Sequence, residues 1–172
     1  ERNEKKALDK ILLACQRPSL AEVATYSYAR GGTKISGPSI HLAKTIAQAW
    51  GNIQFGLKEL EQRHGESTVE AFAWDLENNV KEVRIFQVKH VRDTKKGSYA
   101  LEEGRDIYEL VANQGMRRVR ACILGLIPED IIDSAVEQCD ATLNAKADTG
   151  PEALKKLLDV FESFGVTKLQ IE

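Results

Sequence analysis

The sequence predicts an α+β domain in which a three-stranded antiparallel β-meander packs against helices (a β-β-β-α core), with a helical C-terminal extension. Three observations support this fold class. Apolar residues recur at helical spacing near the N-terminus, alternate with a period of two between residues 53 and 91, and return to helical spacing from residue 105. Because the strands are consecutive and helices flank them, we expect the helices to cover one face of a single sheet.

The N-terminal part is expected to contain two helices. The first spans residues 3–16 and ends at Pro18. A short β-prone run over residues 22–28 leads into a glycine-rich loop. The second helix spans residues 38–50, since proline suits a first turn and Gly51 suits a C-terminal cap.

Three strands follow, within residues 52–60, 67–76 and 80–91. Each combines β-branched or aromatic residues with alternating polarity, and the second turn is expected to centre near Asn78. Residues 92–104 are polar and are interpreted as a loop. The strands therefore form a meander with short connections.

Two further helices are predicted over residues 105–127 and from Pro128 to about Leu143. Residues 144–150 are expected to be a linker, and a last helix follows it. We accordingly divide the chain into a core domain, residues 1–146, and the start of a helical C-terminal segment, residues 147–172. The chain begins at Glu1 and ends in an apparent new helix, so we expect a fragment of a longer protein.

The composition is that of a soluble globular protein, with 42% hydrophobic and 29% charged residues in a chain of 172. No apolar run reaches the ~20 residues that a membrane-spanning helix needs, so no membrane partner is expected. Cys15, Cys122 and Cys139 show neither zinc-site nor disulfide spacing. We interpret them as core thiols of a protein in a reducing cytoplasm.

The charge is unevenly distributed although the net charge is only −2. Residues 80–128 carry ten basic and six acidic side chains, whereas residues 129–172 carry four basic and ten acidic ones. The chain therefore has a basic central segment followed by an acidic C-terminal segment, and this charge asymmetry influences which partners the protein binds.

The stretch "RGGTKISGPSIHLAKTIA" (residues 30–47) resembles a phosphate-binding loop only superficially. A Walker A loop needs its lysine directly after the second glycine, whereas here Lys34 precedes Gly37. A nucleotide triphosphate site is therefore not expected. Two interpretations stay open: a looser phosphate contact through Arg30, Lys34 and the helix N-terminus, or a simple turn.

Basic residues follow the third strand and its exit, and they are candidate contacts to a nucleic-acid backbone. They are Arg84, Lys89, Arg92, Lys95 and Lys96. The alternative is a solvated strand face. In the following helix, Asn113, Arg117 and Arg120 fall on one polar stripe with Arg118 near its edge, and no acidic residue occurs between Glu109 and Glu129. Guanidinium groups suit phosphate oxygens, so these arginines form a second candidate contact.

A nuclease hypothesis rests on Asp75, Gln87 and Lys89, which imitate the metal-and-lysine signature of restriction-like nucleases. The predicted register pairs Asp75 with Lys81 and Gln87 with Val69. Asp75 and Gln87 then lie six residues apart along the ladder, roughly 20 Å, which is too far to share a cation. No Ser/His/Asp set is evident either. We therefore expect no enzyme activity, no metal and no cofactor.

Three stretches, "SGPSIHLAKTIAQAWGNIQFG", "FAWDLENNVKEV" and "DIYELVANQGMRRVRACILGLIP", resemble phage-encoded single-strand annealing recombinases of the RecT/Redβ/Erf class. "FESFGVTKLQIE" resembles the start of the helical C-terminal segment of such proteins. The resemblance covers about residues 20–145. It implies ATP-independent binding of single-stranded DNA and annealing of complementary strands in phage homologous recombination, within the cytoplasm of a bacterial host.

The resemblance also implies a homo-oligomeric ring or filament that holds DNA between a β-hairpin and the long helix. Possible protein partners are a single-strand-binding protein or an exonuclease. By position, Arg117 and Arg118 match the basic pair of the family, while Arg120 lies one place earlier than the family pattern. The carry-over to Arg84, Lys89, Lys95 and Lys96 rests on location only. Arg30, Lys34 and Arg92 are candidate DNA contacts from the sequence pattern alone. The alternatives are a non-enzymatic oligomeric adaptor for replication or recombination proteins and, third, a metal-dependent nuclease.

Overall fold

The computed structural model describes residues 1–146 together with residues 155–156, 158–161 and 164. The predicted linker after Lys146 and most of the predicted last helix lie outside the described residues. The architecture below is therefore that of the core domain.

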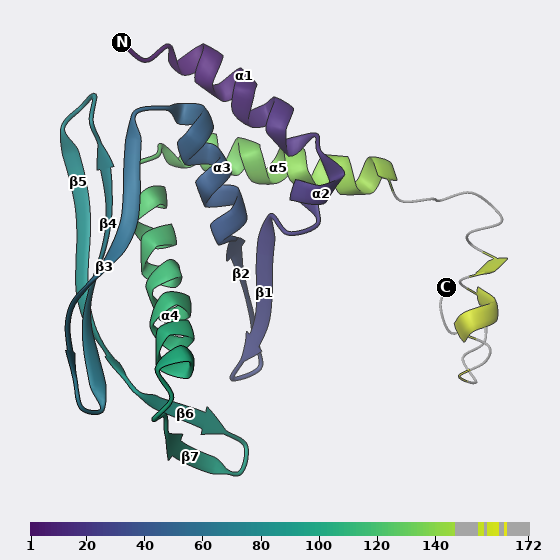
Figure 1. The fold of residues 1–172 in the computed structure, drawn as a ribbon. Coiled ribbons are helices and arrows are strands. Elements are labelled where there is room, and N and C mark those ends of the chain that lie inside the picture. Colours follow the sequence, from purple (N-terminus) through teal and green to yellow (C-terminus); the bar gives the residue numbers. More distant parts are fainter. Residues whose placement is uncertain (147–154, 157, 162–163, 165–172) are drawn as a thin grey trace.

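The elements are, in chain order, α1 (Glu4–Cys15), α2 (Pro18–Ala21), β1 (Thr25–Arg30), β2 (Thr33–Pro38), α3 (Ile40–Trp50), β3 (Ile53–Arg63), β4 (Glu66–Asp75), β5 (Val80–Lys89), β6 (Val91–Thr94), β7 (Gly97–Ala100), α4 (Gly104–Leu124) and α5 (Glu129–Lys146) (Figure 1). β3, β4 and β5 form an antiparallel three-stranded sheet in chain order. The predicted α+β fold class with a β-meander is confirmed.

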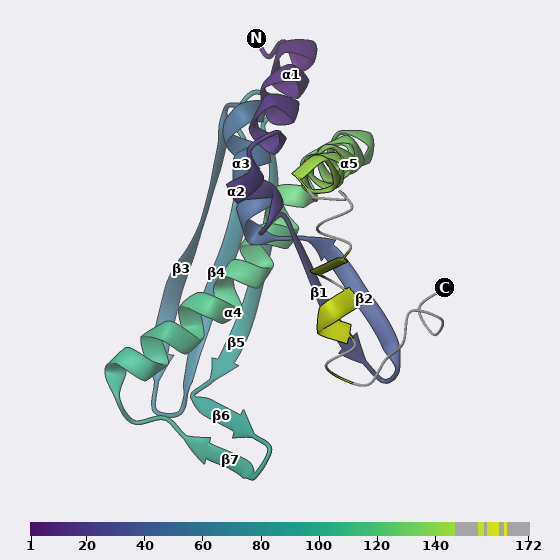
Figure 2. The ribbon, with the colours of Figure 1, turned by 90° about the vertical axis from the view of Figure 1, so that its right-hand side faces the viewer.

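Among the described residues, helices cover one face of the three-stranded sheet and leave the other open. The central strand β4 alternates strictly, and Val69, Ala71 and Ala73 are buried against α4. Figures 1 and 2 show α4 running along this face, while the opposite face carries no helix. The outer face exposes aliphatic residues of β5 to solvent, among them Val83 and Ile85.

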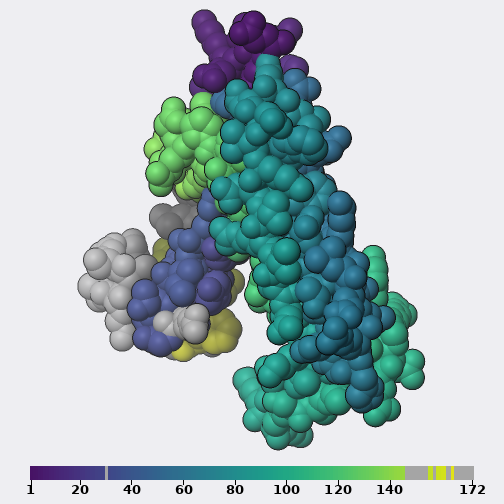
Figure 3. Space-filling view, turned by 90° about the vertical axis from the view of Figure 1, so that its left-hand side faces the viewer, coloured from purple at the N-terminus to yellow at the C-terminus, as the bar shows by residue number. Residues whose placement is uncertain are grey.

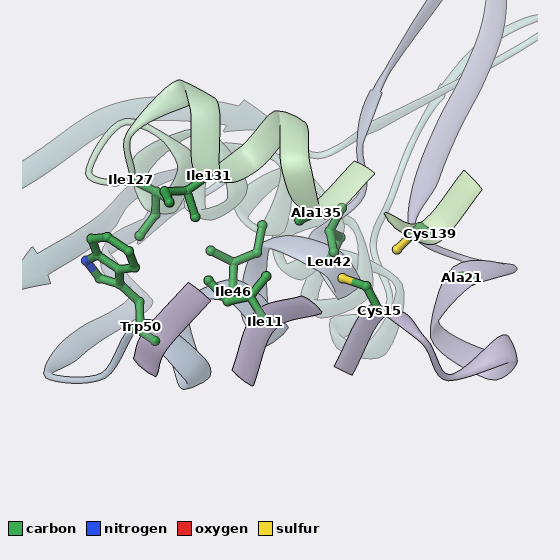
Figure 4. Packing of buried hydrophobic residues seen from close by; sticks show 12 residues of the cluster. Ile11, Cys15, Ala21, Leu42, Ile46, Trp50, Ile127, Ile131, Ala135 and Cys139 are labelled. Atoms are coloured by element: carbon green, nitrogen blue, oxygen red, sulfur yellow. The ribbon is translucent and has the colours of Figure 1, made fainter. Parts of the chain in front are cut away.

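Helix α3 lies between two packed clusters. Its Leu42, Ile46 and Trp50 pack with buried residues of α1, α2 and α5 (Figure 4). Its Ala43 and Ala47 pack instead with the sheet and α4. Small side chains on this second side let the helix approach the sheet closely, so α3 joins the helical layer to the sheet layer.

The glycine-rich loop and residues 92–104, both expected to be loops, belong to hairpins, and the β-prone run over residues 22–28 overlaps strand β1. β1 and β2 pair across Gly31 and Gly32, whose φ values of 57° and 80° are those of a two-residue hairpin turn. β6 and β7 pair across Lys95 and Lys96, so the interpretation of residues 92–104 as a loop was wrong. Every residue of β6 and β7 is exposed, so no alternation of apolar residues marks these strands in the sequence.

The register of the β4–β5 hairpin was predicted one residue out. Asp75 pairs with Val80, not with Lys81, and Gln87 pairs with Thr68. The turn holds four residues, and Asn79 adopts a positive φ of 54° that closes it early. When both faces of a strand carry apolar residues, the sequence pattern does not distinguish two registers that differ by one residue.

The three cysteines are buried and free, as predicted for core thiols. In the described part of the chain, no helix combines the length and the apolar character that a membrane span requires.

Candidate nucleic-acid interface

The predicted polar stripe of α4 is present. Arg117 and Arg120 line an open pocket of about 340 Å³ together with Asn113, Met116 and Ile40. Arg117 is exposed and Arg120 is half-buried. Both guanidinium groups therefore lie on the side of α4 that does not pack on the sheet.

Arg118 lies on the side of α4 that faces β5. Its guanidinium carbon is 4.7 Å from the centre of the Phe86 ring, and its Nη1 donates to Oε1 of Gln114 at 2.7 Å. The cation–π contact and the hydrogen bond fix the direction of the side chain without neutralising its charge.

Arg84 is brought to the same side by the register of the sheet. Its cross-strand partner Ala71 is buried against α4, so Arg84 occupies the helix-facing side of β5. Burial raises the pKa of the Cys122 thiol in α4, and the positive charge of Arg84 opposes that rise. Lys89, at the end of β5, lines an open pocket of about 490 Å³ together with Gln114 and Asp93. Its cross-strand partner is Glu66, so alternation along β5 places the Lys89 side chain on the outer face of the sheet, opposite Arg84.

The β1–β2 hairpin contributes two tyrosines that sequence reasoning missed. The Arg120 guanidinium carbon lies 4.3 Å from the centre of the Tyr26 ring. The Tyr26 and Tyr28 rings are stacked, with centroids 6.0 Å apart and planes 21° apart. The signal in the sequence was "TYSY", since residues two apart on a strand share a face.

These contacts define a depression that we call the α4 groove: its floor is α4, one side is the β1–β2 hairpin and the other is β5. In the space-filling view, the hairpin stands apart from the three-stranded sheet with a hollow between them (Figure 3). The groove residues are Arg84, Arg117, Arg118, Arg120, Tyr26 and Tyr28. Elements far apart in the sequence thus supply one basic and aromatic surface.

In the described part of the chain, the arginines of the α4 groove have no ion-paired carboxylate. None of the four forms an ion pair within 4.0 Å. By contrast, Arg2 and Arg63 elsewhere in the chain are each ion-paired. Of the ten predicted contacts, the structure thus brings Arg84, Arg117, Arg118 and Arg120 together without ion pairs.

The other predicted contacts lie elsewhere. Lys34 lines a different pocket, of about 530 Å³, with Asp133 and Asp140 of α5. Lys95 and Lys96 form the turn of the β6–β7 hairpin, beyond the N-terminal end of α4 (Figure 1). Arg92 in β6 is 4.0 Å from a carboxylate oxygen of Asp106. The backbone of Arg30 ends β1 at the tip of the other hairpin.

The start of α3 offers little to an anion. Ser39 Oγ accepts hydrogen bonds from the backbone N–H groups of His41 and Leu42, at 3.2 and 3.3 Å. These are donors that a phosphate would need. The glycine-rich stretch is therefore a hairpin followed by a capped helix, and its Gly37 packs beneath Tyr26.

The residues of the nuclease hypothesis do not meet. Gln87 is opposite Thr68, seven residues from Asp75 along β4. Asp75 itself is occupied by two hydrogen bonds of 2.9 Å from the Arg2 guanidinium. In the described part of the chain, no three His, Cys, Asp or Glu side chains gather in a metal-binding arrangement.

No known protein-family model matches the chain, and no curated protein and no solved structure matches it.

Proposed function

We propose that this chain binds single-stranded DNA in the α4 groove and anneals complementary strands without ATP. The observation that carries the proposal is the gathering of four arginines, three from α4 and one from β5, that form no ion pair within the described residues. Arginine forks bind phosphate oxygens well, and neutralising the backbone releases counterions. Annealing then needs no proton transfer, because a strand held by its backbone presents its bases to a second strand.

The resemblance in sequence to single-strand annealing recombinases supports a proposal about assembly and biological role. We propose a homo-oligomer, ring or filament, that acts in phage recombination in the cytoplasm of a bacterial host. Its protein partners would be a single-strand-binding protein or an exonuclease. Light scattering with and without an oligonucleotide tests the assembly, and negative-stain images distinguish rings from filaments.

The test of DNA binding is the double variant Arg117→Ala/Arg118→Ala, measured by fluorescence anisotropy with a labelled oligonucleotide at two salt concentrations. We expect weaker binding and a shallower salt dependence, by about 0.7 per lost contact in the slope of log K against log salt. The matched control, Arg17→Ala/Arg63→Ala, also removes two positive charges, from exposed positions away from the groove.

Unchanged affinity in the groove variant would remove the site assignment. Because Arg118 packs on Phe86, circular dichroism must show that both double variants keep the fold. An equal loss of affinity in both would indicate a response to net charge alone, which also contradicts a specific groove.

One observation favours the adaptor alternative. The outer face of the three-stranded sheet exposes apolar side chains of β5, including Ile85 at 62%. Exposed apolar patches often mark protein–protein interfaces. An adaptor would show no salt-dependent binding of oligonucleotides in the same anisotropy experiment, so one measurement separates the two functions.

A further inference from the structure

We infer that Tyr26 and Tyr28 form a stacking platform for unpaired bases of the strand in the α4 groove, with the half-exposed Tyr28 ring as the contact. This inference rests on the proposed function and explains how the groove would select single-stranded nucleic acid. The arginines would hold phosphates, which every nucleic acid has, whereas the tyrosines would take bases that only a single strand leaves free. The ligand class is therefore a polynucleotide with unstacked bases.

Tyr26 is held on two sides. The Arg120 guanidinium lies over its ring at 4.3 Å. Across the hairpin its partner is Gly37, where an added Cβ would stand only 3.0 Å from the tyrosine oxygen. A glycine at this position gives the ring room against β2, so Tyr26 is a fixed base for the stack.

Tyr28 continues the stack and stays accessible. Its ring lies 6.0 Å from that of Tyr26 at an angle of 21°, and half of its surface is exposed. The cross-strand neighbour Ile35 is half-buried beside it. Arg120, Tyr26 and Tyr28 therefore follow one another from the floor of the groove along its hairpin side.

This order suits a single strand. Every base has a π face, so stacking on an aromatic ring is tolerant of sequence, and arginine above a ring adds a cation–π contribution. Bases inside a duplex are already stacked and cannot use the platform. The platform would thus retain a strand before annealing and lose its contact once a complementary strand has paired.

A purely structural role is the competing explanation. A two-stranded hairpin is marginally stable alone, and aromatic pairs on one face support it. That role explains the half-buried Tyr26, but it does not require half of the Tyr28 ring to face solvent. Tyr28 is therefore the residue to test.

The experiment compares oligothymidylate with an abasic oligonucleotide of the same number of phosphates, by anisotropy at one salt concentration. We expect the wild-type chain to bind oligothymidylate about 5- to 100-fold more tightly. Tyr28→Ala should bring this ratio close to one and leave the affinity for the abasic strand unchanged. Tyr28→Phe should keep the ratio, because it keeps the ring.

The control is Tyr99→Ala in β7, which removes a tyrosine with the same 50% exposure outside the groove and should not alter the ratio. A wild-type ratio near one, or a Tyr28→Ala variant that weakens both ligands equally, would overturn the stacking platform while DNA binding stands. Failure to bind either ligand would overturn the proposed function as well.

Discussion

At the scale of single residues, Arg2 and Asp75 form a buried ion pair with two hydrogen bonds. Both Nη atoms of Arg2 donate to Asp75 at 2.9 Å, and the side chains are only 7% and 4% exposed. Arg2 also donates to the carbonyls of Trp50 and Gly51 and lies over the Trp50 ring. One side chain thus ties the N-terminus to the end of α3 and to the β4–β5 turn.

Because of this ion pair, we expect the free energy of unfolding to depend on pH in the acidic range. Hydrogen bonds from Arg2 lower the pKa of Asp75 from 3.8 to about 2. A carboxylate whose pKa is lower in the folded state than in the unfolded state stabilises the fold when the pH is above the unfolded-state pKa. This contribution is lost as the pH falls from about 4 to about 2. Urea unfolding at pH 7, 4 and 3 should show this decline.

Asp75→Asn should lower the free energy of unfolding at pH 7 by about 3 kcal/mol, because it leaves the buried guanidinium only the longer ion pair with Glu77, at 3.7 Å. It should also flatten the decline between pH 4 and 3. Asp9→Asn, at an exposed position of α1, is the control and should keep the wild-type pH profile. An equally steep decline in Asp75→Asn would contradict the assignment of the acid response to this pair.

At the scale of elements, the position of the groove depends on how closely α4 approaches the sheet. Gly115 of α4 is buried over β3, and an added Cβ would stand 2.9 Å from Cδ2 of Leu57. The absence of a side chain there sets the separation between helix and strand. The same approach places Arg118 beside Phe86.

Gly115→Leu should therefore destabilise the protein by about 1–3 kcal/mol through overpacking, although leucine favours helix more than glycine does. The measurement is chemical unfolding. Gly104→Leu at the start of α4 is the matched control, since an added Cβ there meets no atom within 4 Å. Equal stability of the Gly115 variant and wild type would show that α4 can shift away from the sheet without cost.

At the scale of the whole molecule, α3 unites the two packed clusters. Leu42 and Ile46 belong to the cluster with α1, α2 and α5, whereas Ala43 and Ala47 belong to the cluster with the sheet. Because one helix contributes to both, neither cluster is complete without the other. The core domain should accordingly unfold as one cooperative unit.

Leu42→Ala tests whether the core domain unfolds as one cooperative unit. The side chain is fully buried, so its truncation should cost about 3 kcal/mol through lost contacts and a cavity. Far-UV circular dichroism and tryptophan fluorescence should still give coincident unfolding transitions, with the midpoint lowered for both. A helical-layer transition that separates from a later sheet transition would show that the two clusters unfold independently.

The sequence by itself determined the fold class, helices α1, α3, α4 and α5, the three long strands, the buried thiols and the arginine stripe of α4, since each follows from spacing along one element. The short helix α2 was not predicted. Only the tertiary structure decided which basic residues meet. The sequence did not predict the β6–β7 hairpin, the β4–β5 register or the tyrosine stack. Backbone pairing and contacts between distant elements leave no local periodicity in the sequence. Lys34 and Arg120 show the difference: Lys34 lines a pocket with the acids of α5, whereas the Arg120 guanidinium lies over the Tyr26 ring, and spacing along the chain predicts neither placement.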